Sequence, residues 1–215
     1  MKFRVMLAPL VFGTVFLGAG LVGCNATSHM ESMAGESVAV GQDDGHMNMD
    51  LGPADDRVDL RFIDAMVLHH EGAVLMAEEA LEKTNRSEIR VLAEAIIEAQ
   101  AVEIAQMRAW RTAWYPEAGA EPVMFHAEMN HEMAMSEDMR SAMMMAGDLG
   151  AADDTFDLRF LNAMIPHHEG ALVMAQEILE KSDRPEVREL AEAILETQEV
   201  EINQMQEWKQ SWYGE

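Results

Sequence analysis

Four long stretches of the chain carry an apolar residue at every third or fourth position, which is the spacing of one face of an α-helix. The first two stretches cover about residues 56–83 and 86–115, and both recur 98 residues further along the chain. No stretch alternates between apolar and polar residues as a half-buried strand would. The pattern therefore predicts an all-α protein.

The two halves of this pattern are copies of one unit. Residues 50–115 and 148–213 agree at roughly 40 of 66 positions without a gap, which indicates an internal duplication. One helical hairpin cannot bury the apolar faces of both its helices, whereas two hairpins bury them together in a four-helix bundle. The expected organisation of this bundle, residues 54–215, is repeat one at 54–115, a connector at 116–147 and repeat two at 148–215.

Local signals indicate where the helices begin and predict a further helix in the connector. Asn85 stands three residues before Glu88, a spacing typical of an N-cap, and Asp183 stands likewise before Glu186. The connector is rich in methionine, and residues 126–146 are expected to form a shorter fifth helix.

Residues 1–24 are typical of an export signal. Lys2 and Arg4 give a short basic start, and the apolar run that follows ends in Leu-Val-Gly-Cys at Cys24. This ending resembles the bacterial lipobox, so Cys24 is the expected lipidation site; an ordinary signal peptide or an uncleaved anchor is the alternative. Residues 25–53 lack apolar periodicity and are expected to form a flexible tether containing histidine and methionine. The mature protein is therefore expected to be exported and lipid-anchored to a membrane, facing the periplasm or the cell exterior.

Composition and charge narrow the classes of partner. The chain has 15 Lys and Arg against 39 Asp and Glu, a net charge of -24, whereas nucleic-acid binding needs a basic surface. A single cysteine excludes an intrachain disulfide and a cysteine-cluster zinc site. The unusual residue is methionine, with 20 copies against 7 Phe and 2 Tyr. The composition therefore excludes nucleic acid and favours cations as partners.

Histidine, glutamate and methionine share the apolar faces of the predicted helices. In each repeat, two histidines and two methionines lie on one side of the first helix, and a glutamate and a methionine lie on the inward side of the second. Burying histidine and carboxylate costs several kcal/mol unless they pair with each other or bind a metal. The candidate ligands are Met66, His69, His70, Met76, Glu103 and Met107 in repeat one, and Met164, His167, His168, Met174, Glu201 and Met205 in repeat two.

Two interpretations of these buried polar residues are open. A His–Glu hydrogen bond could serve only to fix the register of the bundle. A bundle core can also present side chains from facing helices to a metal ion, and the recurrence of the whole set in both repeats favours this interpretation.

The connector offers a second set of soft ligands, for which the candidates are His126, His131, Met133 and Met135. Met143, Met144 and Met145 are further connector methionines expected to bind Cu(I) or Ag(I). Thioether sulfur is soft and uncharged and suits Cu(I) and Ag(I), while imidazole accepts either oxidation state of copper. Methionine is also a flexible core filler and a sink for oxidants, so packing and redox protection are the alternatives. The sequence leaves open whether the bundle or the connector holds the main site.

The motifs FIDAMVLHHEGAVLMA and FLNAMIPHHEGALVMA are each followed by LAEAI and then by Gln, Glu-Ile, Met and Trp at helical spacing. Together they resemble the bacterial domain-of-unknown-function family numbered 305, over about residues 55–215. The resemblance implies a ferritin-like four-helix bundle, export and an association with copper handling in the periplasm. It points to the residues Met66, His69, His70, Met164, His167 and His168, with Gln100, Glu103, Gln198 and Glu201 opposite them.

These observations predict a lipid-anchored protein that binds copper, preferably as Cu(I), with Cu(II) and silver as alternatives, for buffering, delivery or resistance. Its expected partners are metal ions, the membrane and a copper-handling protein, and no catalysis is expected. A ferritin-like di-iron oxidase is the enzymatic alternative, but such sites use more inward carboxylates than one glutamate per repeat. A metal-free structural or partner-binding lipoprotein is the third hypothesis.

Overall fold

The computed structural model of the protein describes residues 50–215, so the signal segment, Cys24 and most of the expected tether lie outside the described residues. The elements follow in the order α1 (Val58–Lys83), α2 (Ser87–Trp114), β1 (Val123–His126), β2 (His131–Ala134), α3 (Glu137–Met144), α4 (Phe156–Lys181) and α5 (Pro185–Tyr213). None of the helices in residues 50–215 is both long enough and apolar enough to cross a membrane.

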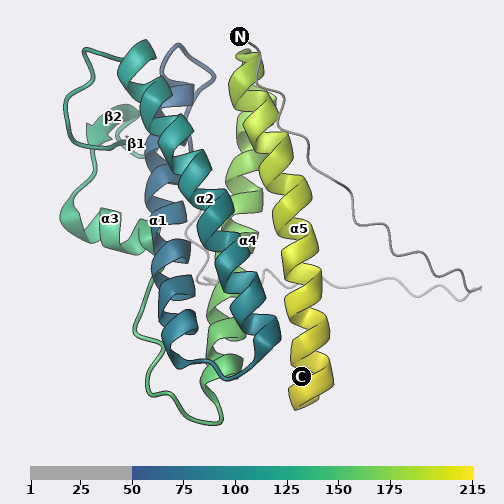
Figure 1. Ribbon diagram of the computed structural model, residues 1–215. Helices are drawn as coiled ribbons and strands as arrows, with labels where there is room; N and C mark the ends of the chain where they lie inside the picture. Colours follow the sequence, from purple (N-terminus) through teal and green to yellow (C-terminus); the bar gives the residue numbers. More distant parts are fainter. Residues whose placement is uncertain (1–49) are drawn as a thin grey trace, which may run out of the picture. The chain divides into compact units, whose positions relative to one another are not determined.

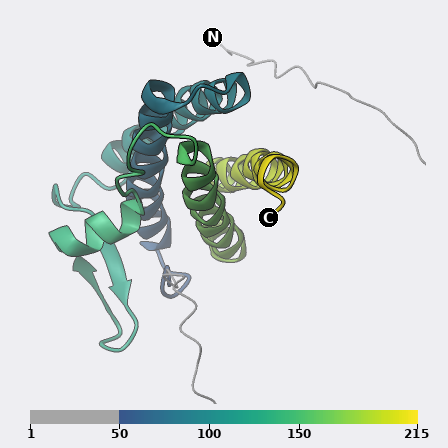
Figure 2. The ribbon, with the colours of Figure 1, turned by 90° about the horizontal axis from the view of Figure 1, so that it is seen from below.

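The four long helices form the predicted bundle from two hairpins. Helices α1 and α4 pack against each other, α2 packs along α1, and α5 packs along α4 (Figure 1). The connector, with β1, β2 and α3, lies on the outer side of α1, as the view from below shows (Figure 2). The mostly helical fold class predicted from the sequence is therefore confirmed.

Two apolar clusters fill the bundle. In α1 the first cluster includes residues up to Leu68 and the second includes residues from Ala73 onward. In α4 the order is reversed, because residues up to Met164 belong to the second cluster and residues from Ala171 onward belong to the first. The histidine pairs of both helices therefore lie midway along the bundle, between the two clusters.

The duplicated hairpins contact each other through equivalent residues. Nζ of Lys83 donates to the main-chain oxygen of Gly150 at 2.6 Å, and Nζ of Lys181 donates to that of Gly52 at 2.6 Å. Each lysine thus joins the end of the first helix of one repeat to the segment that precedes the first helix of the other. The exchange indicates that the two repeats are related by an approximate two-fold axis.

The turns within the hairpins differ from the predicted caps. Thr84 Oγ1 accepts a hydrogen bond from the Arg86 N–H at 3.0 Å, and the equivalent Ser182 Oγ accepts one from the residue two further on at 3.1 Å. The N-cap positions of α2 and α5 are arginines without a side-chain cap bond. The prediction of Asn85 and Asp183 as caps is therefore wrong, because the buried hydroxyl one residue earlier organises each turn.

The connector differs most from its prediction. Instead of one helix over residues 126–146, β1 and β2 form an antiparallel hairpin in which Val123 lies opposite Ala134 and His126 opposite His131. Only the short helix α3 follows. The prediction of a helix in the connector is therefore correct only for Glu137–Met144, and the expectation that no strand forms is wrong.

Contacts with α1 explain the hairpin. The Val123 N–H donates to Oδ2 of Asp64 at 2.9 Å, and Nε of Arg57 donates to Glu132 at 2.9 Å. Between the strands Asn130 has a φ of 50°, in the left-handed region that asparagine tolerates better than most residues. These tertiary contacts outweigh the helical tendency of a segment rich in methionine, alanine and glutamate.

Candidate metal centre

Four histidines occupy the middle of the bundle, two on α1 and two on α4. His69, His70, His167 and His168 are each at most 2% exposed. Because adjacent residues on a helix point about 100° apart, the two members of each pair face different neighbours. The rings of His69 and His167 meet between α1 and α4, with centroids 3.8 Å apart. We call these two the inner histidines, and His70 and His168 the outer histidines.

Each outer histidine is bound to a glutamate of its own hairpin. Nε2 of His70 donates to Glu103 on α2 at 2.7 Å, and Nε2 of His168 donates to Glu201 on α5 at 2.7 Å. An ionised carboxylate only accepts, so the proton lies on Nε2 and the lone pair on Nδ1. Among residues 50–215 neither Nδ1 has a hydrogen-bond partner. A histidine oriented by a carboxylate in this way is typical of a metal ligand.

The inner histidines have fewer partners. Nε2 of His167 donates to the main-chain oxygen of Met144 at 3.1 Å, which leaves the lone pair on Nδ1. Within the described part of the chain, Nδ1 of His167 and both ring nitrogens of His69 have no hydrogen-bond partner. A buried polar atom without a partner costs about 1–3 kcal/mol. A bound cation would offset that cost.

Burial keeps the inner histidines neutral. Loss of solvation, reinforced by the neighbouring histidines, lowers the pKa of His69 well below 6.5 and lowers the pKa of His167 to about 3. Neutral imidazole is the form that binds metal. At neutral pH these two rings can therefore bind a cation without first losing a proton.

Two glutamines extend the outer layer. Gln100 and Gln198 are buried, and in the described residues neither Oε1 has a hydrogen-bond partner. With Glu103 and Glu201 they line a cavity of about 10 Å³ between α2 and α5, which is room for about one water or ion. The glutamate side chains remain 19% and 14% exposed, so they connect the outer histidines with solvent.

The predicted bundle methionines are all buried in the apolar clusters. The first cluster contains Met66, Met107 and Met174, and the second contains Met76, Met164 and Met205. Each cluster thus takes methionines from both repeats. Packing accounts for these side chains, and their role as ligands stays a prediction.

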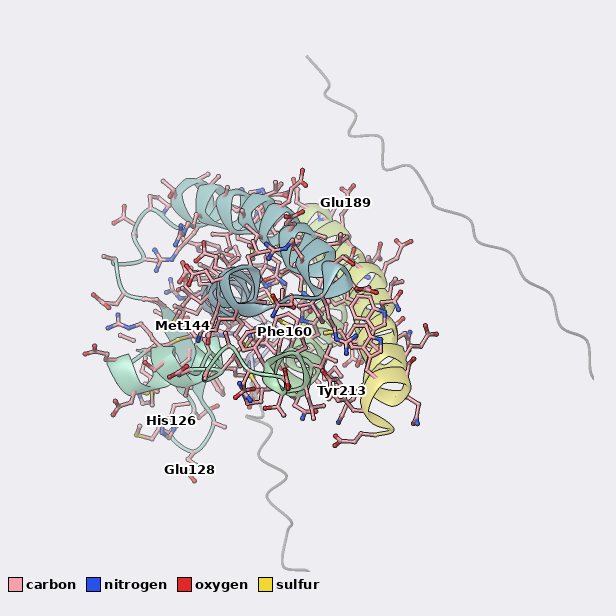
Figure 3. The ribbon with its side chains drawn as sticks, turned by 60° about the horizontal axis from the view of Figure 1, so that its bottom comes forward. His126, Glu128, Met144, Phe160, Glu189 and Tyr213 are labelled. Atoms are coloured by element: carbon pink, nitrogen blue, oxygen red, sulfur yellow. The ribbon has the colours of Figure 1, made fainter. Side chains whose placement is uncertain are left out.

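The predicted connector ligands are divided between the hairpin and the core. His126 and His131 lie opposite each other on the two strands with ring centroids 6.3 Å apart, and Figure 3 shows His126 at the outer side of the molecule. Met133 lies opposite Met124 on the neighbouring strand, and Met135 is buried in the first apolar cluster. The structure therefore does not bring the hairpin histidines to the bundle histidines.

A larger cavity lies beneath the hairpin. It has a volume of about 380 Å³, and its lining includes His126 and the four methionines Met124, Met135, Met139 and Met143. Of this lining, His126, Met135 and Met143 were among the predicted ligands. The cavity is thus a second place where thioether sulfur gathers, separate from the histidine layer.

The bundle does not assemble a cluster of hard ligands. Among residues 50–215 no group of three or more His, Cys, Asp or Glu side chains converges as a metal site. The donors come in pairs instead, imidazole beside imidazole and imidazole beside carboxylate. A di-iron centre needs several convergent carboxylates, so this arrangement gives no support to the di-iron alternative.

The fold brings one methionine of the connector, Met145, to the histidine layer, a place that the sequence did not predict. Sδ of Met145 and Nε2 of His69 both lie within 4 Å of the position where a Cβ on Gly170 would sit. The available signal was the glycine that follows His-His-Glu in each repeat, Gly72 and Gly170, because glycine often marks the close approach of another segment.

Known proteins share this sequence pattern and fold. The domain of unknown function DUF305 matches residues 59–209. CopM in its Cu(II)-bound form is 38% identical, with a TM-score of 0.58 over 72% of this chain and 97% of CopM. A DUF305 protein from Streptomyces coelicolor, designated a candidate secreted protein, is 27% identical, with a TM-score of 0.53 over 70% of this chain and 90% of its own.

A shorter match extends beyond bacteria. The uncharacterized protein L153 of Acanthamoeba polyphaga mimivirus is 41% identical over 49 residues, which are 23% of this chain and 32% of L153. The chain thus spans about a third of the length of this curated relative. The DUF305 match, in contrast, includes both repeats and the connector between them. The chain therefore belongs to the DUF305 family, as its paired histidine motifs predicted.

Proposed function

We propose that the protein binds soft metal ions at its paired buried histidines: copper, preferably as Cu(I), with Cu(II) and silver as alternatives. One observation carries the proposal. Within residues 50–215 five buried ring nitrogens have no hydrogen-bond partner, two on His69 and one on each of His70, His167 and His168. Each raises the free energy of the folded state, and a cation bound by a neighbouring pair of them would lower it.

The outer layer supports the same proposal. Glu103 and Glu201 hold the protons of the outer histidines on Nε2. The Nδ1 lone pairs of these two histidines are therefore available to a cation. Both carboxylates are partly exposed, and they offer an approaching cation a negative path from solvent. Metal binding therefore needs no unfolding of the bundle.

Copper and silver are favoured by the donors and by the relatives. Imidazole binds copper in either oxidation state, and thioether sulfur strengthens binding of Cu(I) and Ag(I). CopM has been seen with Cu(I), Cu(II) and silver bound, and this chain matches 97% of its length in each of these forms. We extend metal binding of this kind to the present protein.

The same proposal places the protein outside the cytoplasm, attached to a membrane by lipid on Cys24. The Leu-Val-Gly-Cys sequence and the candidate secreted relative support export. The role that fits is buffering, delivery or resistance, in which the metal is cargo and no catalysis takes place. A copper-handling protein that exchanges the ion is the expected partner.

A metal-free role has one specific observation in its favour. The two His–Glu hydrogen bonds would fix the register of the bundle even without a cation. The inner histidines distinguish the two roles, because among the described residues neither of them forms a hydrogen bond with a glutamate and three of their four ring nitrogens have no hydrogen-bond partner.

Melting curves with and without Ag(I) test the proposal. The full-length protein, purified in detergent and stripped of metal, gains roughly 2.7 kcal/mol per site at free metal near 100 times the dissociation constant. For a domain of this size the melting temperature then rises by about 5–10 °C. Two double variants should lose most of this rise: His69→Gln with His167→Gln, and His70→Gln with His168→Gln.

The matched control is the hairpin variant His126→Gln with His131→Gln, which should keep the rise. If the rise vanishes in the hairpin variant and persists in both bundle variants, the proposed site is wrong. If the outer variant lowers only the metal-free melting temperature and leaves the response to Ag(I) intact, the outer histidines fix register and do not bind metal.

Membrane attachment has a separate test. Cys24→Ala in the full-length protein should move it from the membrane fraction to the soluble exported fraction. A processed Cys24→Ala protein that stays in the membrane fraction contradicts lipidation.

A further inference from the structure

The end of α3 lies directly against α1 beside the inner histidines. A Cβ on Gly72 would overlap the main-chain oxygen of Met144, and the same oxygen accepts the hydrogen bond from His167. Met144 is half-buried, and Figure 3 shows it where the connector meets the bundle. The connector is therefore fixed to the histidine layer at the point where α3 ends.

The next residue, Met145, has a backbone conformation that methionine rarely adopts. It is the C-cap of α3, with φ 47° and ψ 19° in the left-handed region. Glycine is the usual residue at a left-handed helix end, because any Cβ there is strained. Strain of this kind is concentrated at functional sites, where the side chain serves a purpose that glycine could not.

The side chains of Met145 and His69 both lie close to Gly170. Measured from the position of a Cβ on Gly170, Nε2 of His69 lies at 3.1 Å and Sδ of Met145 at 3.8 Å. Gly170 has no side chain to separate these two atoms. Nε2 of His69 is buried, and no described residue offers it a hydrogen bond. A ring nitrogen without a hydrogen-bond partner and a thioether sulfur thus border the same small space.

We propose that Sδ of Met145 and Nε2 of His69 bind the same monovalent soft cation, Ag(I) or Cu(I), with the imidazole of His167 as the neighbouring donor. The inference rests on the proposed function, because it requires metal at the inner histidines. It adds that the connector supplies a ligand to the bundle.

This added ligand determines selectivity. Histidine and glutamate alone also suit Zn(II), which binds nitrogen and oxygen donors. A thioether is soft and neutral, and it favours Cu(I) and Ag(I) over harder divalent ions. The connector therefore turns a general histidine site into one that prefers monovalent soft ions.

The first test compares Met145→Leu with Met144→Leu in the full-length, metal-stripped protein. Both changes keep size and apolarity. Met144 contacts His167 through its main chain, so Met144→Leu is the matched control. In competition titrations Met145→Leu should lower the affinity for Ag(I) by about tenfold or more and change that for Zn(II) by less than about threefold. Equal Ag(I) affinities in the two variants overturn the proposal.

The second variant, Met145→Gly, separates binding from folding. Glycine removes the sulfur and also relieves the left-handed strain, so the metal-free melting temperature should rise while the Ag(I) affinity falls as in Met145→Leu. A rise in melting temperature with unchanged Ag(I) affinity shows that Met145 only terminates α3, and this contradicts the proposal.

A direct readout is the methionine methyl region in NMR of protein labelled with ¹³C at the methionine methyl groups. One equivalent of Ag(I) should shift the Met145 signal, which is assigned by its loss in Met145→Leu. His69→Gln distinguishes failure of metal binding at the histidines from failure of the role of Met145. If His69→Gln binds Ag(I) as tightly as the unaltered protein, the proposed function fails. If His69→Gln weakens binding and Met145→Leu does not, only the role of Met145 fails.

Discussion

The two repeats carry the same His-His-Glu-Gly motif, yet the single connector meets them differently. At Gly72 the neighbour is the main-chain oxygen of Met144, whereas at Gly170 the neighbours are side-chain atoms of His69 and Met145. At the outer histidines the repeats are alike, with His–Glu distances of 2.7 Å in both. Symmetry therefore holds in the outer layer and is broken in the inner one.

This difference shows how a duplicated bundle acquires an asymmetric site. The repeats determine where the histidines lie, because equivalent positions on α1 and α4 meet at the middle of the bundle. The connector occurs once, so it can contact only one face of the pair. It gives His167 a main-chain acceptor and places the Met145 thioether near His69.

The largest expected effect is a loss of stability at low pH that is caused by the burial of the inner histidines. In the unfolded chain His167 binds a proton below pH 6.5, but in the folded protein only below about 3. Between these values the unfolded state holds more protons, so the free energy of unfolding decreases as the pH falls through this window. His167 alone should contribute a loss of about 1.4 kcal/mol per pH unit, or about 3 kcal/mol from pH 6.5 to 4.

Urea unfolding of the metal-free protein between pH 4 and 7 measures this loss. Burial acts on His69 in the same direction, and the nearby His70 and His168 also disfavour added charge at these rings. His167→Gln is the control, because the carboxylates titrate in both proteins and only the histidine term differs. Parallel curves for the two proteins contradict the burial argument.

The second prediction compares the motif glycines directly. Replacing a helical glycine by alanine normally gains up to about 1 kcal/mol. At Gly72 the new Cβ overlaps a main-chain oxygen, so the end of α3 has to move and Gly72→Ala should lose about 1–3 kcal/mol. At Gly170 the new Cβ would lie 3.1 Å from Nε2 of His69 and 3.8 Å from Sδ of Met145, so only side chains have to shift slightly and Gly170→Ala should lose less stability than Gly72→Ala.

For Ag(I) affinity we expect the opposite order, with the larger effect from Gly170→Ala. The methyl group of Gly170→Ala enters the space between His69 and Met145, so we expect weaker Ag(I) binding without loss of any ligand. Thermal melts and Ag(I) titrations of both variants, with Gly119→Ala in a loop as control, measure the two effects. Equal destabilisation by Gly72→Ala and Gly170→Ala would mean that the connector meets both repeats alike.

The sequence was sufficient for the bundle because its signals are local and repeated. The 3.6-residue spacing identified the faces that the fold buries, and the duplication implied two hairpins. The connector hairpin depends instead on long-range partners such as Arg57 with Glu132, which are 75 positions apart. Local composition favours a helix there, so the strands could not be predicted from the connector alone.

The site was predictable to a similar extent. Helical spacing placed each glutamate opposite a histidine pair, and the structure shows which member it binds, His70 or His168. Helical spacing alone did not show that His69 and His167 would meet each other, because that contact depends on how α1 packs on α4. Met145 was among the methionines expected to bind soft metal, but its place beside the inner histidines could not be predicted, because it lies outside the repeats and only the folded connector brings it there.

The smallest expected effect tests the symmetry of the outer layer. Glu103→Gln and Glu201→Gln each keep an oxygen that accepts from histidine Nε2 but remove the charge that strengthens the bond. The difference between a charged and a neutral hydrogen bond is about 1 kcal/mol, and because the two pairs have the same geometry the two losses should agree within about 0.5 kcal/mol. Urea unfolding of the two variants, without metal, measures both losses under the same conditions. A loss at one glutamate that exceeds the other by more than about 1 kcal/mol would show that the connector, whose β1 and α3 pack on α1, also differentiates the outer histidines.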